Sequence, residues 1–128
     1  NEAPVMKRAH ILIVEDDAWL ADEYARTLKS AGYTTGHAGN SLDAIGLIDV
    51  KRPACILLDL FMPGPNGLVL LHELKSHSDL ANIPVVLISN AASDLANDSL
   101  HSYGVMQVLD KATMHPEDVP AAVKKVLP

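Results

Sequence analysis

Short runs of apolar residues recur along the chain, and most of them are almost uninterrupted. Such runs, rich in Val and Ile, are typical of strands that are buried on both faces of a sheet. The run that begins at Tyr33 is the weakest. The predicted strands are 10–14, 33–38, 55–58, 85–88 and 105–109.

Between these runs, larger apolar residues recur every three or four positions, which is the spacing of one helical face. The stripes that predict helices lie within 18–31, 42–48, 68–74, 93–103 and 118–126. The periodicity of 93–103 is poor. The expected inward-facing residues of the second and third helices are Leu42, Ile45, Ile48, Leu68, Leu71 and Leu74.

Strands that alternate with helices predict an α/β fold, with a parallel sheet covered by helices on both faces. A chain of 128 residues is the size of one domain. We expect an N-terminal extension at 1–8 and a single domain at 9–128. The chain stops soon after the last predicted helix, so no output domain is expected within it.

Composition narrows the class of protein. Ten basic residues against sixteen acidic ones give a formal charge of −6, which argues against direct nucleic-acid binding. Cys55 is the single cysteine, so an internal disulfide is excluded, and we expect Cys55 to be a core residue. No apolar run approaches the ~18 residues of a membrane span, and a signal-peptide pattern is missing. These features predict a cytoplasmic protein.

Polar residues stand where the predicted strands end. The first strand is followed by Glu15-Asp16-Asp17, and the others by Asp59, Ser89 and Asp110-Lys111. Because the carboxyl ends of parallel strands share one edge of a sheet, these side chains are expected to converge there. Each acid taken alone is more typical of a loop or a helix cap, and Asp17 is expected to be a cap.

Clustered carboxylates repel one another, and a divalent cation removes this conflict. Ligation by oxygen alone suits Mg²⁺, which also binds phosphate oxygens. A carboxylate beside Mg²⁺ is suited to accept a phosphoryl group, which Lys111 and Ser89 would bind.

In these motifs the chain resembles the receiver domain of bacterial two-component response regulators, of the chemotaxis-regulator type. The resemblance runs from about His10 to Leu127. It rests on Ile-Leu-Ile-Val-Glu15-Asp16-Asp17, Leu-Leu-Asp59-Leu-Phe-Met-Pro-Gly-Pro-Asn-Gly67, Pro-Val-Val-Leu-Ile-Ser89 and Lys111.

The resemblance implies a five-stranded sheet in the order 2-1-3-4-5 and a Mg²⁺ cofactor. It makes Asp59 the phosphoacceptor and a metal ligand, and Asp16 a direct ligand. Glu15 would hold the ion through water, and the backbone carbonyl of Phe61 would be a further ligand.

The resemblance also implies that Ser89 and Lys111 bind the phosphoryl group. The donor would be a phosphohistidine on a histidine kinase or a phosphotransfer protein, which docks near Trp19 and Leu20. Packing of Trp19 against the sheet is the alternative. The phosphorylated chain would then alter its binding to an output partner that the sequence does not identify. We expect a signalling domain that catalyses only its own phosphotransfer and dephosphorylation.

Two positions depart from the family pattern. Ala112 stands where the family has a proline in a cis peptide bond after the lysine, so either the strain is retained or the loop is rebuilt. Val108 stands where the family has a switching aromatic residue, so the conformational readout must use another element. Asn90 is bulkier than the small residue common after Ser89, and we hypothesise that it alters water access to the acyl phosphate.

Alternatives stay open at this point. An aspartate-nucleophile phosphohydrolase carries a second Asp two residues after the first, where this chain has Phe61. A flavin binder would want a glycine-rich phosphate loop in place of the acids after the first strand. A degenerate receiver that signals without phosphorylation is compatible with Val108 and Ala112.

Other features carry less chemistry. The six histidines do not share a helical face, and we interpret them as surface or capping residues. The segment 93–103 has no basic residue, which favours a monomer because it lacks half of a charge-paired dimer face.

Overall fold

Five parallel strands form one sheet in the computed structural model, which describes residues 8–60, 67–90 and 101–128. The strand order is β2-β1-β3-β4-β5, as expected. The strands are β1 (His10–Val14), β2 (Thr34–Ala38), β3 (Cys55–Asp59), β4 (Val85–Ser89) and β5 (Val105–Asp110).

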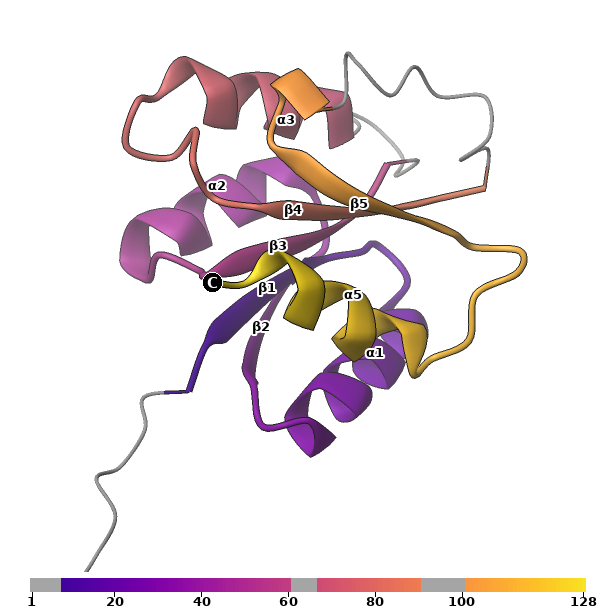
Figure 1. Ribbon diagram of the computed structural model, residues 1–128. Coiled ribbons are helices and arrows are strands. Elements are labelled where there is room, and N and C mark those ends of the chain that lie inside the picture. Colours follow the sequence, from indigo (N-terminus) through magenta and orange to yellow (C-terminus); the bar gives the residue numbers. More distant parts are fainter. Residues whose placement is uncertain (1–7, 61–66, 91–100) are drawn as a thin grey trace, which may run out of the picture.

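The helices cover both faces of the sheet (Figure 1). They are α1 (Ala18–Ser30), α2 (Ser41–Val50), α3 (Gly67–Ser76) and α5 (Asp118–Val126). The helices α1 and α5 lie on one face, and α2 and α3 lie on the other. Most of the helix predicted within 93–103 falls outside the described residues.

The central strands are buried on both faces, which explains their continuous apolar sequences. In β1, Ile11 and Ile13 pack under α1 and α5, whereas Leu12 and Val14 pack under α2 and α3. All residues of β3 and β4 are buried. Each large aliphatic side chain so buried contributes about 1.5–3 kcal/mol, so the sheet is a rigid support for what lies at its edge.

An irregularity in β5 sets the direction of its last residues. Val85 pairs with Val105 but Val86 pairs with Gln107, so Met106 is an extra residue and lies half exposed. A shift by one residue exchanges the two faces of a strand. The shift therefore fixes which side chains at the end of β5 face the sheet edge.

The expected faces of α2 and α3 were wrong in part. Leu42 is 73% exposed and Leu68 is 42% exposed. The predicted Ile48, Leu71 and Leu74 are buried, and they are joined by Ser41, Ala44, Gly67 and Leu70.

Small residues explain why the buried faces of α2 and α3 differ from the predicted ones. A Cβ atom on Gly67 would lie 3.1 Å from Cα of Leu60 and 3.2 Å from the carbonyl of Asp59. The glycine thus lets α3 begin directly against the end of β3. Ser41 and Ala44 likewise place the backbone of α2 close to the sheet.

Within the described residues, no helix is both long and apolar enough to span a membrane.

Candidate functional site

The acidic loop after β1 is held by backbone contacts. The N–H of Glu15 donates to the carbonyl of Ala38 at 3.0 Å, one residue beyond the paired part of β1 and β2. The side chain of Asp17 accepts from the N–H groups of Trp19 at 2.9 Å and Leu20 at 3.2 Å. Asp17 is therefore the cap of α1, as predicted, and Glu15 and Asp16 are left to face the sheet edge.

Three carboxylates meet at this edge. Oxygens of Glu15, Asp16 and Asp59 all lie within 4.8 Å of one another. Glu15 is 1% exposed and Asp59 is 4% exposed, whereas Asp16 is exposed to solvent. Two of the three acids are thus buried, and the third lies on the open side.

Lys111 supplies a positive charge to the cluster. Its Nζ atom lies 3.4 Å from Oδ2 of Asp59 and 3.5 Å from Oε1 of Glu15. The backbone N–H of Lys111 donates to the carbonyl of Ser89 at 2.9 Å, which extends the pairing of β4 and β5 to this residue.

The loop after Lys111 is rebuilt and not strained. No cis peptide bond occurs among the described residues, which include the bond between Lys111 and Ala112. The Asp110 side chain accepts from the N–H of Ala112 at 2.9 Å, and the Asp110 carbonyl accepts from the N–H of Met114. This turn, centred on Asp110, aims Lys111 without a proline.

The electrostatics of the cluster favour a bound cation. Burial, followed by Asp59 and Asp16, raises the pKa of Glu15 to about 8. Burial by itself lowers the pKa of Lys111, but the charges of Asp59 and Glu15 outweigh it, and the net pKa is raised.

The donor set fits a hard dication. Among the residues that the structure describes, Oε1 of Glu15 is buried without a hydrogen-bond partner, and the Lys111 ammonium lies beside it. One ammonium does not neutralise three carboxylates. Carboxylate oxygens around an open side are the ligands that Mg²⁺ prefers, since this ion keeps several waters.

The remaining predicted residues differ in burial and in whether the structure describes them. Ser89 is fully buried at the end of β4, directly after Ile88, which pairs with Asp59. Val108 is half-buried and packs on the α2 and α3 side of the sheet. Asn90 is exposed, and Phe61 lies outside the described residues.

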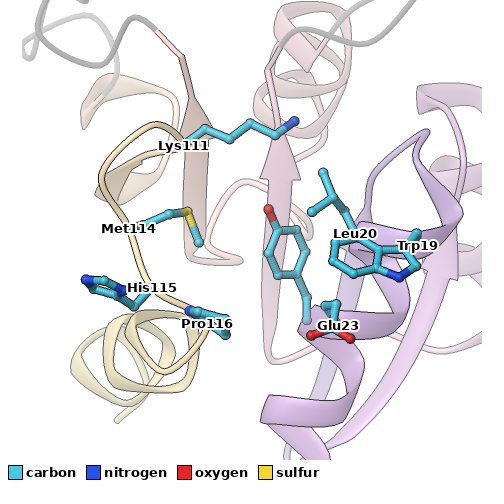
Figure 2. Close-up of a pocket in the computed structure, with 8 residues that line it drawn as sticks. Trp19, Leu20, Glu23, Lys111, Met114, His115 and Pro116 are labelled. Carbon is cyan, nitrogen blue, oxygen red and sulfur yellow. The ribbon is translucent and has the colours of Figure 1, made fainter.

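An apolar groove of about 150 Å³ lies beside the cluster. Figure 2 shows it with α1 on one side, the loop after β5 on the other and Lys111 at its head. Trp19 is 69% exposed here, so the alternative that it packs against the sheet was wrong. Sequence reasoning missed Met114 and Pro116, which line the groove, because loop residues carry no periodic signal.

Comparisons with known proteins agree with this geometry. Residues 11–124 match the family model of the response regulator receiver domain. The DNA-binding response regulator MtrA of Mycolicibacterium paratuberculosis is 34% identical over 82 residues, which are 64% of this chain and 35% of that protein. The phosphate regulon transcriptional regulatory protein PhoB of Pseudomonas aeruginosa is 35% identical over 79 residues, 62% of this chain and 34% of that protein. The chain thus spans about a third of the length of these relatives.

Solved structures share the fold. Chemotaxis protein CheY4 of Vibrio cholerae superposes with a TM-score of 0.86 at 22% identity, over 94% of this chain and all of that one. NtrX of Brucella abortus superposes with a TM-score of 0.82 at 26% identity, over 94% of this chain and 27% of that one. With the family match over most of its length, the chain belongs to the receiver domains of response regulators.

Proposed function

We propose that Asp59 accepts a phosphoryl group from a phosphohistidine, in a step that depends on Mg²⁺. The observation that carries the proposal is the environment of Asp59. It is a nearly buried carboxylate with the Lys111 ammonium at 3.4 Å and two further carboxylates within 4.8 Å.

The step balances as a displacement at phosphorus. A carboxylate oxygen of Asp59 forms the new O–P bond while the P–N bond to the partner's imidazole breaks, and the released nitrogen takes a proton. The product is an acyl phosphate on Asp59.

Asp16 and Asp59 would hold the Mg²⁺ directly and Glu15 would hold it through water. The backbone carbonyl of Phe61, which lies outside the described residues, remains a predicted further ligand. When bound, the ion neutralises charge on the phosphoryl oxygens. The sheet itself holds the carboxylates of Glu15 and Asp59 in place, because both are buried at its edge.

Lys111 would bind one phosphoryl oxygen after leaving its present partners, and the Ser89 hydroxyl would bind another. Val108 offers no aromatic ring to swing toward the sheet. The change in affinity for an output partner is therefore carried by another element, through a shift between two conformers.

The donor would be a histidine kinase or a phosphotransfer protein, with Trp19 and Leu20 as contact residues. Trp19 is exposed and flanks the groove that ends at Lys111 (Figure 2). A partner helix seated there would bring its histidine to the open side of the cluster. We place this activity in the cytoplasm, as a signalling step without turnover of a separate substrate.

The competing phosphohydrolase function is disfavoured by Phe61, which stands where such an enzyme has its general acid. The test is incubation with acetyl phosphate, with and without Mg²⁺, followed by intact mass measurement. We expect the mass of one phosphoryl group to be gained only with Mg²⁺, lost in Asp59→Asn and kept in Asp49→Asn, an exposed acid on α2. Steady release of phosphate from many monoesters without a trapped intermediate would contradict the proposal.

A further inference from the structure

The backbone of Glu15 is held on both sides by the end of β2. On one side its N–H donates to the carbonyl of Ala38. On the other side, Nε2 of His37 lies 2.7 Å from the carbonyl oxygen of Glu15. Because a carbonyl can only accept, Nε2 carries the hydrogen and donates it. The His37 side chain thus fixes the peptide that joins Glu15 to Asp16.

The imidazole replaces a missing strand donor. In a parallel pair, a residue that donates its N–H to one partner residue accepts at its carbonyl from the N–H two residues further along the partner strand, which for Glu15 would be Asn40. The pairing of β1 with β2 ends at Val14 and Ala38, since Asn40 turns away to cap α2 by accepting from the N–H of Asp43 at 2.9 Å. The carbonyl of Glu15 therefore depends on a side chain for its partner, and His37 provides it.

Asp16 is the residue that this contact controls most directly. Its side chain is exposed, so core packing does not fix its position. The direction of its backbone follows the preceding peptide, whose carbonyl lies 2.7 Å from Nε2 of His37. This peptide joins Glu15, whose carboxylate is buried, to Asp16, whose carboxylate is exposed.

We propose that His37 is a positioning residue for the cation site, which holds the Glu15–Asp16 peptide so that the two carboxylates converge. The inference rests on the proposed Mg²⁺ site, and it gives a role to a histidine that the sequence pattern left on the surface. Loss of the hydrogen bond would leave the ligands present but free to turn away from one another.

The test compares Mg²⁺ affinity, by isothermal titration calorimetry, in His37→Ala and His37→Gln. The glutamine amide nitrogen reaches about as far from the backbone as Nε2 and can donate to the same carbonyl. His10→Ala is the matched control, because His10 joins β1 to β2 at the opposite end through Oγ1 of Thr34 at 2.9 Å. Urea unfolding without Mg²⁺ reports stability separately.

We expect His37→Ala to bind Mg²⁺ roughly 10-fold more weakly, and His37→Gln to bind like the unmodified chain, as for other groups that orient metal ligands. His10→Ala should lose stability and keep its affinity. His37 is exposed, so its substitution leaves the core intact.

Three outcomes would overturn the inference: unchanged affinity in His37→Ala, equal loss in His37→Gln, or equal loss in His10→Ala. An unmodified chain that fails to bind Mg²⁺ would remove the proposed function and this inference together. Binding by the unmodified chain with no effect of His37→Ala would remove only the role of His37.

Discussion

The carboxylate of Glu15 is buried beside two further carboxylates, and one of its oxygens has no hydrogen-bond partner in the described part of the chain. Its pKa of about 8 lies above the ordinary value of 4.5 because burial and the neighbouring acids favour the neutral form. At the scale of single residues, the site therefore costs stability at neutral pH while no cation is bound. This cost is a physical reason for the cluster to favour a bound dication.

The pH dependence of stability follows with a definite sign. Between about pH 4.5 and pH 8 the folded chain binds more protons at Glu15 than the unfolded chain does, so stability falls as pH rises. We expect metal-free urea unfolding to show this fall, and Glu15→Gln to flatten it. The comparison removes the contribution of His10, whose pKa burial lowers. If the unfolding free energy changed with pH equally in both proteins, the raised pKa of Glu15 would be contradicted.

Lys111 has two opposed effects that one substitution separates. Lys111→Met removes the ammonium that competes with Mg²⁺ for Asp59 and Glu15, so Mg²⁺ affinity should rise. Phosphorylation by acetyl phosphate should slow roughly 10- to 100-fold, since one charge-assisted hydrogen bond to the phosphoryl group is lost. Calorimetry and the rate of mass gain measure the two effects. Weaker Mg²⁺ binding in Lys111→Met would contradict this placement of the ammonium.

At the scale of elements, the apolar runs predicted the strands to within about one residue at each end. The prediction succeeds because β1, β3 and β4 are buried on both faces, so their residues are apolar except at the ends, His10, Asp59 and Ser89. Helix faces were harder to predict, because α2 and α3 touch the sheet through small residues. Hydrophobicity alone does not reveal that Ser41 or Gly67 faces inward.

This difference gives a test on α2. Ile48 is 3% exposed and Leu42 is 73% exposed, although the spacing places both on one stripe. We expect Ile48→Ala to lower the free energy of unfolding by about 2–4 kcal/mol through loss of core packing. Leu42→Ala should change it by less than about 0.5 kcal/mol. Urea unfolding in the presence of Mg²⁺ measures both changes. Similar losses of unfolding free energy in the two variants would mean that Leu42 faces the core, as the sequence spacing predicts.

Part of the candidate site could likewise be predicted from the sequence, and part could not. Glu15, Asp59 and Lys111 could be brought together from the sequence because they end parallel strands. The extra residue Met106 and the turn at Asp110, which together aim Lys111, have no signal in a single sequence. The contact of His37 is also hidden, because it depends on where β2 leaves the sheet.

At the scale of the whole molecule, the acidic cluster and the apolar groove lie side by side, because Lys111 lines the groove and contacts Glu15 and Asp59. The chain carries a formal charge of −6, so an approaching partner is favoured when the surface around its histidine is neutral or basic. The exposed Trp19 offers such a partner a large apolar contact.

Trp19→Ala tests this docking. Transfer from a phosphorylated histidine phosphotransfer protein should slow by roughly 10-fold or more, since exposed aromatic anchors carry much of the binding energy at interfaces. Phosphorylation by acetyl phosphate should slow much less. Val50→Ala is the control, because this residue is 84% exposed at the end of α2, on the other face of the sheet from the groove. An equal effect of Trp19→Ala on both donors would place Trp19 outside the interface.

The phosphoacceptor itself is tested most directly by chemical trapping. Reduction with borohydride converts an aspartyl phosphate into homoserine, and peptide mass mapping then locates the modified residue. After incubation with acetyl phosphate and Mg²⁺, we expect homoserine at position 59 alone. Homoserine at another acid, or a phosphoryl group found only on a histidine or serine, would contradict it.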